Sequence, residues 1–236
     1  MHLFYAPHIF QKAGELNLDE AESLHFHVLR IADDESFLIT NGKGVLCKAQ
    51  LLAKTKRQVR IKYFDCIEKT IGKKMHLAVA PLKHNDRFDM LLEKITELGI
   101  TDIWPVYTHY TERKKINEGR MEKRLVAAMK QSQRVFKPQL HPLLPVGEFF
   151  EQLPDTVFRL IAHCKHHDMP LLSEALKNAS ANEILVLVGP EGGFSEDEIY
   201  QAVQSGFKEV SLSTNRLRTE TAAMVAAMMM QIGESL

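Results

Sequence analysis

The sequence predicts an α/β protein in which a small N-terminal β domain precedes a mostly parallel sheet covered by helices on both faces. From about residue 75 onward, apolar strand-like runs alternate with segments whose apolar residues recur at helical spacing. Before that point the runs are short, and apolar residues alternate with polar ones. The pattern changes in the polar stretch KTIGKK (69–74). We therefore expect two domains, over residues 1–71 and 72–236.

The N-terminal domain is expected to be a small β-barrel or sandwich with one short helix over residues 18–29. Asn41-Gly42-Lys43-Gly44 is a hairpin signal between two alternating runs. The run 59–63 (VRIKY) alternates apolar and basic residues. One face of that strand should therefore be cationic.

In the C-terminal domain the same criteria predict strands over 75–82, 102–108, 157–164, 183–189 and 208–213. Helices are predicted over 86–98, 118–135, 171–178, 195–205 and 219–232. Gly99 and Gly206 stand where C-terminal helix caps belong. Ser195 followed three residues later by Glu198 is a capping box.

Composition excludes several classes of protein. Of the 236 residues, 45% are hydrophobic and 25% charged, which is ordinary for a globular chain. No apolar run approaches the roughly 18 residues of a transmembrane helix, and the start MHLFYAPHIFQKAG lacks the pattern of a signal peptide. Cys47, Cys66 and Cys164 are odd in number and far apart in the sequence. We therefore expect no disulfide framework and a reducing cytoplasm.

The net charge is zero, but the basic residues are unevenly placed. Residues 37–64 carry seven Lys or Arg and no acid, and residues 112–137 carry nine against three Glu. Two basic islands are typical of a phosphate-contacting surface. They are also what ordinary solvated faces look like, and charge alone favours that simpler interpretation.

The stretch VGPEGGFSEDEI (188–199) follows an apolar strand and opens a helix. In a parallel sheet, ligands bind beyond the carboxyl ends of the strands. Adjacent Gly192 and Gly193 permit close backbone approach, and the N–H groups at a helix N-terminus suit an anion or the polar atoms of a ligand. The alternative is a tight strand-to-helix turn, which leaves Glu191 unexplained.

A second unusual loop, STNRLRTETA (213–222), follows the next strand. Thr219 or Thr221 would serve as a helix cap, and Glu220 suits a first helical turn. Capping does not explain Arg216 and Arg218. Neither a P-loop GxxxxGK[ST] nor a GxGxxG after the first strand is present, so the standard nucleotide-binding folds are disfavoured.

Together, GPEGGFS (189–195) and RLRTETA (216–222) closely resemble the RsmE family of SPOUT-type RNA methyltransferases, which methylate N3 of a uridine in small-subunit ribosomal RNA. Softer matches are HFHVLR (25–30), KITELG (94–99) and QSQR (131–134), so the resemblance covers most of the chain. One departure is Ser213, where the family pattern has glycine. This departure affects the register of Arg216 more than that of Arg218.

The resemblance implies a trefoil-knotted α/β domain over 72–236 and a PUA-like RNA-binding β-barrel over 1–71. The knot would form the pocket for S-adenosylmethionine, and two subunits would pair there as a homodimer. The implied partner is small-subunit ribosomal RNA, in an assembled subunit, in the cytoplasm and away from membranes.

The resemblance also implies site residues in the loops after strands 157–164, 183–189 and 208–213. Those expected to bind the cofactor are His163, Leu187, Gly189, Gly193, Leu212, Leu217, Arg218 and Thr221. Those expected near the target base are Glu191, Arg218, Glu220 and Arg134. A carboxylate would accept the N3 proton, and a guanidinium would stabilise negative charge on a uracil oxygen. Which group acts as the base stays open, and for Glu220 a capping role is equally good.

Basic residues from both islands are candidates for phosphate contact. They are Arg30, Lys54, Lys56, Arg57, Arg60, Arg113, Lys114 and Lys115. The run HCKHHD (163–168) matches no standard zinc spacing, so a metal-free loop is expected. Met224 and the run 228–230 are expected to pack the last helix, in part at the dimer contact.

Two other functions fit the same features. One is a knotted methyltransferase that acts on transfer RNA, and the other is a non-catalytic RNA-binding module with a decayed cofactor site. The intact GPEGG and RTET motifs argue against decay. The N-terminal barrel and the residues of both motifs favour ribosomal RNA over transfer RNA as the substrate.

Overall fold

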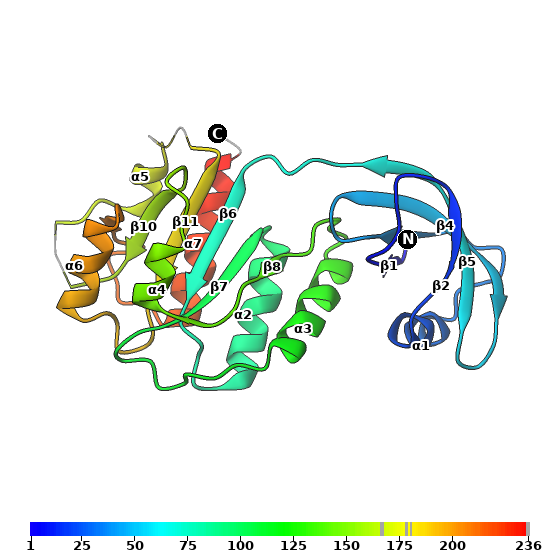
Figure 1. Cartoon of the computed structure of the whole chain (residues 1–236), viewed down its shortest axis with the longest axis horizontal. Helices are drawn as coiled ribbons and strands as arrows, with labels where there is room; N and C mark the ends of the chain where they lie inside the picture. The colour runs from blue at the N-terminus through cyan, green and yellow to red at the C-terminus, as the bar shows by residue number, and fades with distance from the viewer. Residues whose placement is uncertain (166–167, 178, 180, 235–236) are drawn as a thin grey trace. The chain divides into compact units, whose positions relative to one another are not determined.

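The computed structural model describes residues 1–165, 168–177, 179 and 181–234 (Figure 1). It divides into two compact units, one of Met1–Ile71 with Val126–Lys137 and the other of Gly72–Leu125 with Pro138–Leu236. The change of periodicity near residue 71 thus coincides with a border between units. The segment Val126–Lys137, which the sequence places in the second domain, packs with the first unit instead.

The first unit contains a five-stranded sheet and helix α1 (Glu20–Leu29). Its strands are β1 (Leu3–Tyr5), β2 (Gly14–Asn17), β3 (Phe37–Thr40), β4 (Val45–Lys54) and β5 (Val59–Glu68). They lie in the order β1-β3-β4-β5-β2, with β1 parallel to β3 and the other pairs antiparallel. Phe4, Phe26 and Phe37 pack against one another at the centre of its core.

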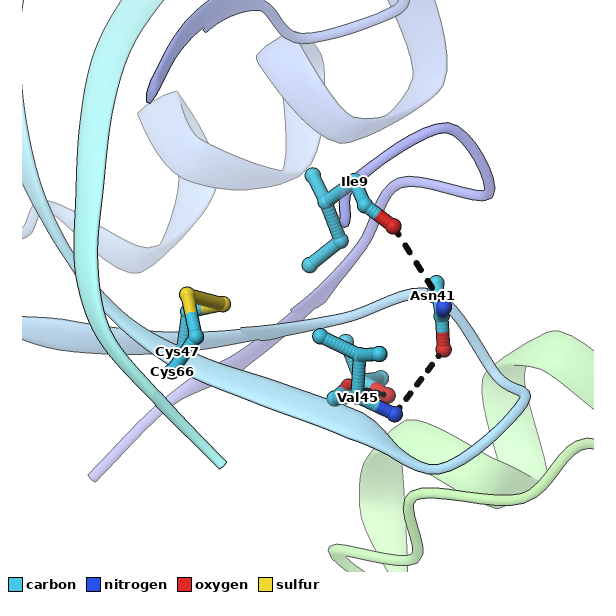
Figure 2. The surroundings of a disulfide bond; sticks show 6 residues. Ile9, Asn41, Val45, Cys47 and Cys66 are labelled. Carbon is cyan, nitrogen blue, oxygen red and sulfur yellow. Dashed lines mark hydrogen bonds between the residues drawn. A yellow bond between two sulfur atoms is a disulfide. The ribbon is translucent and has the colours of Figure 1, made fainter. Parts of the chain in front are cut away.

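The predicted hairpin joins β3 to β4. Asn41 Oδ1 accepts from the backbone N–H of Val45 at 3.1 Å, and its Nδ2 donates to the Ile9 carbonyl at 3.4 Å (Figure 2). The same Oδ1 also accepts from the Lys43 N–H at 2.8 Å. Along β5, Val59, Ile61 and Tyr63 are buried, whereas Arg60 and Lys62 between them are exposed. The expected cationic strand face is therefore confirmed.

The segment Val126–Lys137 is held to the hairpin by backbone contacts. The Val135 carbonyl accepts from the Gly44 N–H at 3.1 Å and from Thr40 Oγ1 at 3.3 Å. Helix α3 (Glu118–Gln131) stops at Gln131 rather than at the predicted Val135. It stops because Gln133 adopts a left-handed φ of 54° and the chain turns away.

The expectation of no disulfide is wrong, because Cys47 and Cys66 are bonded (Figure 2). They are 19 positions apart in the sequence, but β4 and β5 run antiparallel and bring their Cα atoms within 4.1 Å. Separation in the sequence was therefore a poor guide to disulfide bonding, because strand pairing determines which cysteines meet. Cys164 is free and exposed.

The second unit is built on a parallel sheet. Its strands are β6 (Lys74–Val79), β7 (Asp102–Tyr107), β8 (Gln139–Leu140), β9 (Leu144–Pro145), β10 (Phe158–Ala162), β11 (Glu183–Val188) and β12 (Lys208–Val210). The order is β12-β10-β11-β6-β7-β8, and β9 pairs with β7. Every one of these pairs is parallel, which confirms the predicted fold class.

Helices cover both faces of this sheet (Figure 1). On one face Leu77 and Val186 pack with α2 (Asn85–Glu97), α5 (Leu172–Lys177) and α7 (Thr219–Glu234). On the other face Ala78 and Leu185 pack with α4 (Val146–Glu151) and α6 (Glu196–Gln204). Helix α4 and the short strands β8 and β9 were not predicted from the sequence.

Three of the predicted helix caps are confirmed. Gly99 ends α2 with φ 91°, and the Ile100 N–H returns to the Ile95 carbonyl. Gly206 ends α6 in the same way, and Ser195 opens α6 with the expected capping box. In the described ranges, no helix has both the length and the apolar character needed to cross a membrane.

Candidate cofactor pocket and active site

A cavity of about 590 Å³ lies in the second unit where β10, β11 and β12 end. Because the three strands are parallel neighbours, their carboxyl ends meet at one edge of the sheet. Three loops line the cavity, contributing residues 162–165, 188–194, and 211–213 with 215–219, and Ala222 of α7 completes the lining. Both motif loops identified in the sequence therefore form walls of the same cavity.

The loop after β11 is held in one shape by contacts that require its glycines. The Gly193 N–H donates to the Pro190 carbonyl at 2.8 Å, and Gly193 has φ 75°, which L side chains rarely adopt. A Cβ at Gly189 would stand 2.9 Å from the Phe194 ring. At Gly192 it would stand 2.7 Å from Tyr110 Cβ.

Helix α6 anchors this loop through Glu198, which is only 8% exposed. One carboxylate oxygen accepts from the Ser195 N–H at 2.8 Å, and the other accepts from the His109 N–H at 2.7 Å. The same side chain thus completes the capping box and joins the glycine loop to the segment after β7. Two charge-assisted bonds from backbone groups make this a rigid joint.

His163 lines the cavity at the end of β10, with its side chain 3% exposed. Its Nδ1 accepts from the Lys165 N–H at 3.3 Å, and its Nε2 lies 3.0 Å from Glu209 Oε1. Since a ring nitrogen that accepts carries no proton, Nε2 carries the proton and donates to Glu209. His163 in this form is neutral and ties the loop after β10 to β12.

The loop before α7 presents Arg216 and Arg218 at the rim of the cavity, both exposed. Neither guanidinium is hydrogen-bonded or ion-paired to any residue that the structure describes. The Arg218 carbonyl accepts the first helical bond, from Ala222 at 2.8 Å, so Arg218 and not Thr219 occupies the cap position. The N-terminus of α7, with its partial positive charge, therefore faces the cavity.

The structure brings most of the predicted site residues together. Seven line the cavity: His163, Gly189, Glu191, Gly193, Leu212, Leu217 and Arg218. Leu187 does not line it, because neighbouring side chains of a strand point to opposite faces. Leu187 packs toward α4 and α6, and Val188 lines the cavity in its place. Thr221 is also outside the lining.

Two of the residues predicted near the target base lie elsewhere. Glu220 is 8% exposed, is outside the lining, and has Oε1 3.7 Å from Arg87 Nη1. Arg134 belongs to the segment that packs with the first unit. Among the described lining residues, Glu191 is thus the only acidic side chain, and it is exposed.

Sequence reasoning missed part of the lining. The missed residues are Ala162, Cys164, Lys165, Val188, Pro190, Phe194, Ser211, Asn215, Thr219 and Ala222. For Val188 the alternation of strand side chains was an available signal. The others depend on how three loops, distant in sequence, fold over one edge of the sheet.

The predicted phosphate-contacting residues differ in how they are held. Arg60 pairs with Glu15 at 2.8 Å, and Lys54 pairs with Asp33. Lys56 and Arg57 are exposed in the turn between β4 and β5, and Arg30 is exposed after α1.

In the second unit, Arg113 Nε donates to the Lys115 carbonyl at 2.9 Å. The Lys114 ammonium lies 5.5 Å from the Tyr107 ring centroid. All three predicted basic residues of this segment, Arg113, Lys114 and Lys115, therefore follow β7.

Among the described residues, no group of three or more His, Cys, Asp or Glu is arranged to hold a metal ion. His166 and His167 of the run 163–168 lie outside the described residues. In α7, Met230 is buried in the core of the second unit, whereas Met228 is 45% exposed.

Comparison with known proteins agrees with this architecture. A family model described as an RNA methyltransferase domain matches residues 69–231, and one described as an RNA methyltransferase PUA domain matches residues 18–63. These matches confirm the expected RNA methyltransferase domain and the PUA-type N-terminal domain.

Individual relatives match over most of their length. The ribosomal RNA small subunit methyltransferase E of Rickettsia conorii is 29% identical over 221 residues, which cover 91% of this chain and 89% of that protein. The protein of the same description from Synechocystis is 30% identical over 211 residues, which cover 86% and 68%.

A solved structure extends the likeness to three dimensions. The Neisseria gonorrhoeae ribosomal RNA small subunit methyltransferase E bound to S-adenosyl methionine has a TM-score of 0.85 at 28% identity. The match covers 98% of this chain and 97% of that one. Together, the family model, the relatives and the shared fold show that this chain belongs to the ribosomal RNA small subunit methyltransferase E family of RNA methyltransferases.

Proposed function

We propose that this chain transfers a methyl group from S-adenosylmethionine to N3 of a uridine in small-subunit ribosomal RNA. One observation carries the proposal. The two motif loops of a chain that belongs to this family both line a single cavity at the carboxyl edge of the parallel sheet. The relatives described above are named for methylation of the same RNA.

The cavity fits S-adenosylmethionine in size and chemistry. About 590 Å³ lies within the range of roughly 300–1,000 Å³ of small-molecule sites. Val188, Leu212 and Leu217 supply apolar walls for an adenine ring, and the glycine loop brings backbone close to a ligand. When bound, the cofactor supplies an electrophilic methyl group on a sulfonium.

The chain's own residues would orient the reactants and manage the proton. The rigid loops hold the donor in place, so positioning supplies much of the rate. Glu191, which is exposed and lines the cavity, would accept the N3 proton, and Arg218 would stabilise the charge on a uracil oxygen. Glu220 beside Arg87 is a less direct base, and Arg134 would act only if it meets the cavity of a second subunit.

The partners follow from the same proposal. The N-terminal unit would hold RNA with the basic residues of its β4–β5 face, and the second unit with Arg113, Lys114 and Lys115. A homodimer working on assembled small subunits in the cytoplasm completes the proposal. The Cys47–Cys66 bond is unusual for that compartment, where most thiols are reduced.

The first experiment measures S-adenosylmethionine binding by calorimetry. We expect about one site per chain, weakened by Arg218→Ala because one polar contact at the rim is lost, which is worth roughly tenfold in affinity. Arg57→Ala, an exposed arginine of the first unit, is the matched control and should bind normally. Absence of binding to the unmodified chain would contradict the proposal and favour a non-catalytic RNA-binding module.

The second experiment identifies the product. Small ribosomal subunits and transfer RNA are each incubated with the chain and labelled S-adenosylmethionine, and the labelled nucleoside is then identified. We expect N3-methyluridine in small-subunit RNA. Label in transfer RNA alone, or at another base atom, would contradict the proposed substrate.

A further inference from the structure

The segment that follows β7 begins with a hydrogen-bonded turn, residues 108–111, which lies against the glycine loop. The Thr108 N–H donates to Thr111 Oγ1 at 2.8 Å, and the Thr111 N–H returns to the Thr108 carbonyl at 3.2 Å. Both threonines are buried, and the His109 N–H is held by Glu198. The turn is therefore fixed at both ends before any ligand binds.

Tyr110, at the tip of this turn, is both held and exposed. A Cβ added to Gly192 would stand only 2.7 Å from the Cβ of Tyr110. Tyr110 therefore packs directly against the backbone of Gly192. The side chain of His109 meets the Tyr110 ring edge-on, with ring centroids 4.7 Å apart and an interplanar angle of 84°. Even so, Tyr110 is 48% exposed.

Gly192 connects this tyrosine to the candidate active site. The same residue lines the cavity and contacts Tyr110, which is itself outside the lining. The thickness of one glycine backbone thus separates the exposed ring from the cavity. The atoms of Tyr110 nearest to Gly192 are Cβ, Cγ and Cδ2, so this packing does not account for the exposure of the rest of the side chain.

Basic residues stand close to Tyr110 in the sequence. Arg113, Lys114 and Lys115 follow within five positions, and Lys83 pairs with Glu112 at 2.9 Å. That hydrogen bond raises the pKa of Lys83, so this ammonium stays charged. Exposed aromatic rings flanked by cations bind single-stranded nucleotides, because the ring stacks on a base and the cations contact phosphates.

We propose that Tyr110 is a stacking platform for an RNA base next to the target uridine. His109 supports the ring, and the joint at Gly192 and Glu198 sets its position relative to the cavity. This inference rests on the proposed function, since it assumes that RNA enters from the rim marked by Glu191. It adds an RNA-positioning residue that neither motif contains.

The test compares Tyr110→Ala, Tyr110→Phe and Tyr200→Ala. Tyr200 is the matched control, since it is 66% exposed on α6 and does not line the cavity. Each variant is tested for binding to purified small ribosomal subunits that carry no N3-methyluridine, for methyl transfer to them, and for S-adenosylmethionine binding by calorimetry.

Loss of one stacked base is worth about 1–3 kcal/mol, so Tyr110→Ala should weaken subunit binding roughly 5- to 150-fold. Tyr110→Phe keeps the ring face and should bind almost as the unmodified chain does. Tyr200→Ala should also bind normally. All three variants should keep normal cofactor affinity, because neither tyrosine lines the cavity.

Three results would overturn the inference. Unchanged subunit binding by Tyr110→Ala would show that no base stacks there, and equal damage by Phe and Ala would indicate a hydroxyl contact. A loss of cofactor affinity or of self-association in Tyr110→Ala would make the residue a support for the loop or for a second copy. If the unmodified chain transfers no methyl group, the proposed function fails, and subunit binding still tests the platform separately.

Discussion

Gly189, Gly192 and Gly193 lie within five positions, yet each is required for a different physical reason. Gly189 makes room for the Phe194 ring, and Gly192 makes room for Tyr110. Gly193 has open space around a Cβ, but its φ of 75° strains any L side chain. The sequence shows the glycines and the loop, whereas only the structure separates close approach from backbone conformation.

Gly192→Ala is therefore expected to be costly. The added methyl would meet Tyr110 Cβ at 2.7 Å, and neither backbone-linked atom can rotate away, so the loop must shift. Overpacking of this kind costs about 1–3 kcal/mol of unfolding free energy, measured by chemical denaturation. The shift should also weaken S-adenosylmethionine binding in calorimetry, since Gly192 lines the cavity.

The matched control for that variant is Gly147→Ala. A Cβ at Gly147 meets nothing within 4 Å, and the residue lies in helix α4. Alanine is a better helix former than glycine by about 1 kcal/mol, so this variant should be neutral or slightly more stable. If the two alanine variants unfold alike, the contact between Gly192 and Tyr110 does not hold in solution.

At the scale of elements, the β4–β5 hairpin carries a cross-link that alternation alone does not reveal. The register of this pair shifts between Leu46 and Lys48, which places Cys47 across from Cys66. Cys47 is buried in the core of the first unit. The strands themselves were predictable, but their register depends on a bulge that leaves no clear mark in the sequence.

Reduction should destabilise the first unit. A cross-link that closes a loop of this size, 19 positions, is worth about 3 kcal/mol through the entropy of the unfolded chain. We expect dithiothreitol to lower the denaturation midpoint of the unmodified chain. It should leave a Cys47→Ala, Cys66→Ala double variant unchanged.

A thiol titration in denaturant decides whether the bond forms. The chain has three cysteines, so a bonded pair leaves Cys164 as the one reactive thiol. Three reactive thiols in protein purified without reductant would refute the cross-link. Protein trapped by rapid alkylation in living cells would show which state the cytoplasm maintains.

A second element-scale feature lies at the other end of the sheet from the cavity. His76 of β6 is 8% exposed, with Nδ1 3.6 Å from Asp102 Oδ2 and Nε2 3.6 Å from Glu183 Oε2. His141 Nε2 lies 2.9 Å from Asp102 Oδ1, and its ring stacks on Trp104 at 3.4 Å. Two histidines and two carboxylates thus form a half-buried cluster at the N-terminal ends of β6, β7 and β11, together with the residue that follows β8.

This cluster makes stability depend on pH in a defined direction. Burial lowers the pKa of His76 below its usual 6.5, although Asp102 and Glu183 oppose the shift. The unfolded chain therefore takes up this proton at a higher pH than the folded chain does. The contribution of neutral His76 to the free energy of unfolding is fully present above about pH 6.5. It is lost as the pH falls through the lower pKa that His76 has in the folded chain.

Asp102 makes the free energy of unfolding depend on pH in a more acidic range. Burial works to raise the pKa of Asp102, but the hydrogen bond from His141 and the charge of His76 hold it below its usual 3.8. Its stabilisation is present above about pH 3.8 and is lost below that pH.

Thermal unfolding between pH 7.5 and 5.0 tests the contribution of His76. We expect the midpoint of the unmodified chain to fall on acidification and His76→Gln to reduce that fall. A pH slope unchanged by His76→Gln would show that the shift arises elsewhere, for example at His25, whose pKa burial also lowers.

At the scale of the whole molecule, predictability follows the range of the interactions. Local patterns predicted the alternation of strands and helices, the glycine caps and the capping box, because each depends on residues within one turn. The cysteine pair, the packing of Val126–Lys137 and the ion pair of Glu220 depend on residues distant in sequence. Helix α4 was missed because its six residues are too few for a periodic signal.

The candidate site divides in the same way. Five of the seven predicted residues that line the cavity belong to the two motifs, 189–195 and 216–222, each of which is continuous in the sequence. Leu187 does not line the cavity, whereas its strand neighbour Val188 does, and Tyr110 lies in no motif at all. Residues brought to a site by neighbouring loops are thus visible only after the sheet order is known.

The distribution of charge over the molecule leads to the last prediction. Net charge is zero, and many basic side chains are already paired with acids, as Lys48 is with Asp65 at 3.1 Å and Arg60 with Glu15 at 2.8 Å. Arg57 is exposed at the β4–β5 turn, and its guanidinium has no hydrogen-bond or ion-pair partner among the described residues. Only a cation of this kind can neutralise a phosphate without first giving up a carboxylate.

Arg57→Ala should therefore flatten the salt dependence of RNA binding. Each phosphate contact contributes roughly 0.7–0.9 to the slope of log affinity against log salt, so the slope should fall by about one unit. Lys48→Ala, which removes an equally exposed but paired cation, should leave the slope unchanged. The measurement is filter binding of small-subunit RNA from 50 to 200 mM salt, roughly the range over which counterion release is read. Equal slopes for Arg57→Ala and the unmodified chain would remove this turn from the RNA-binding surface and leave that role to the basic segment after β7.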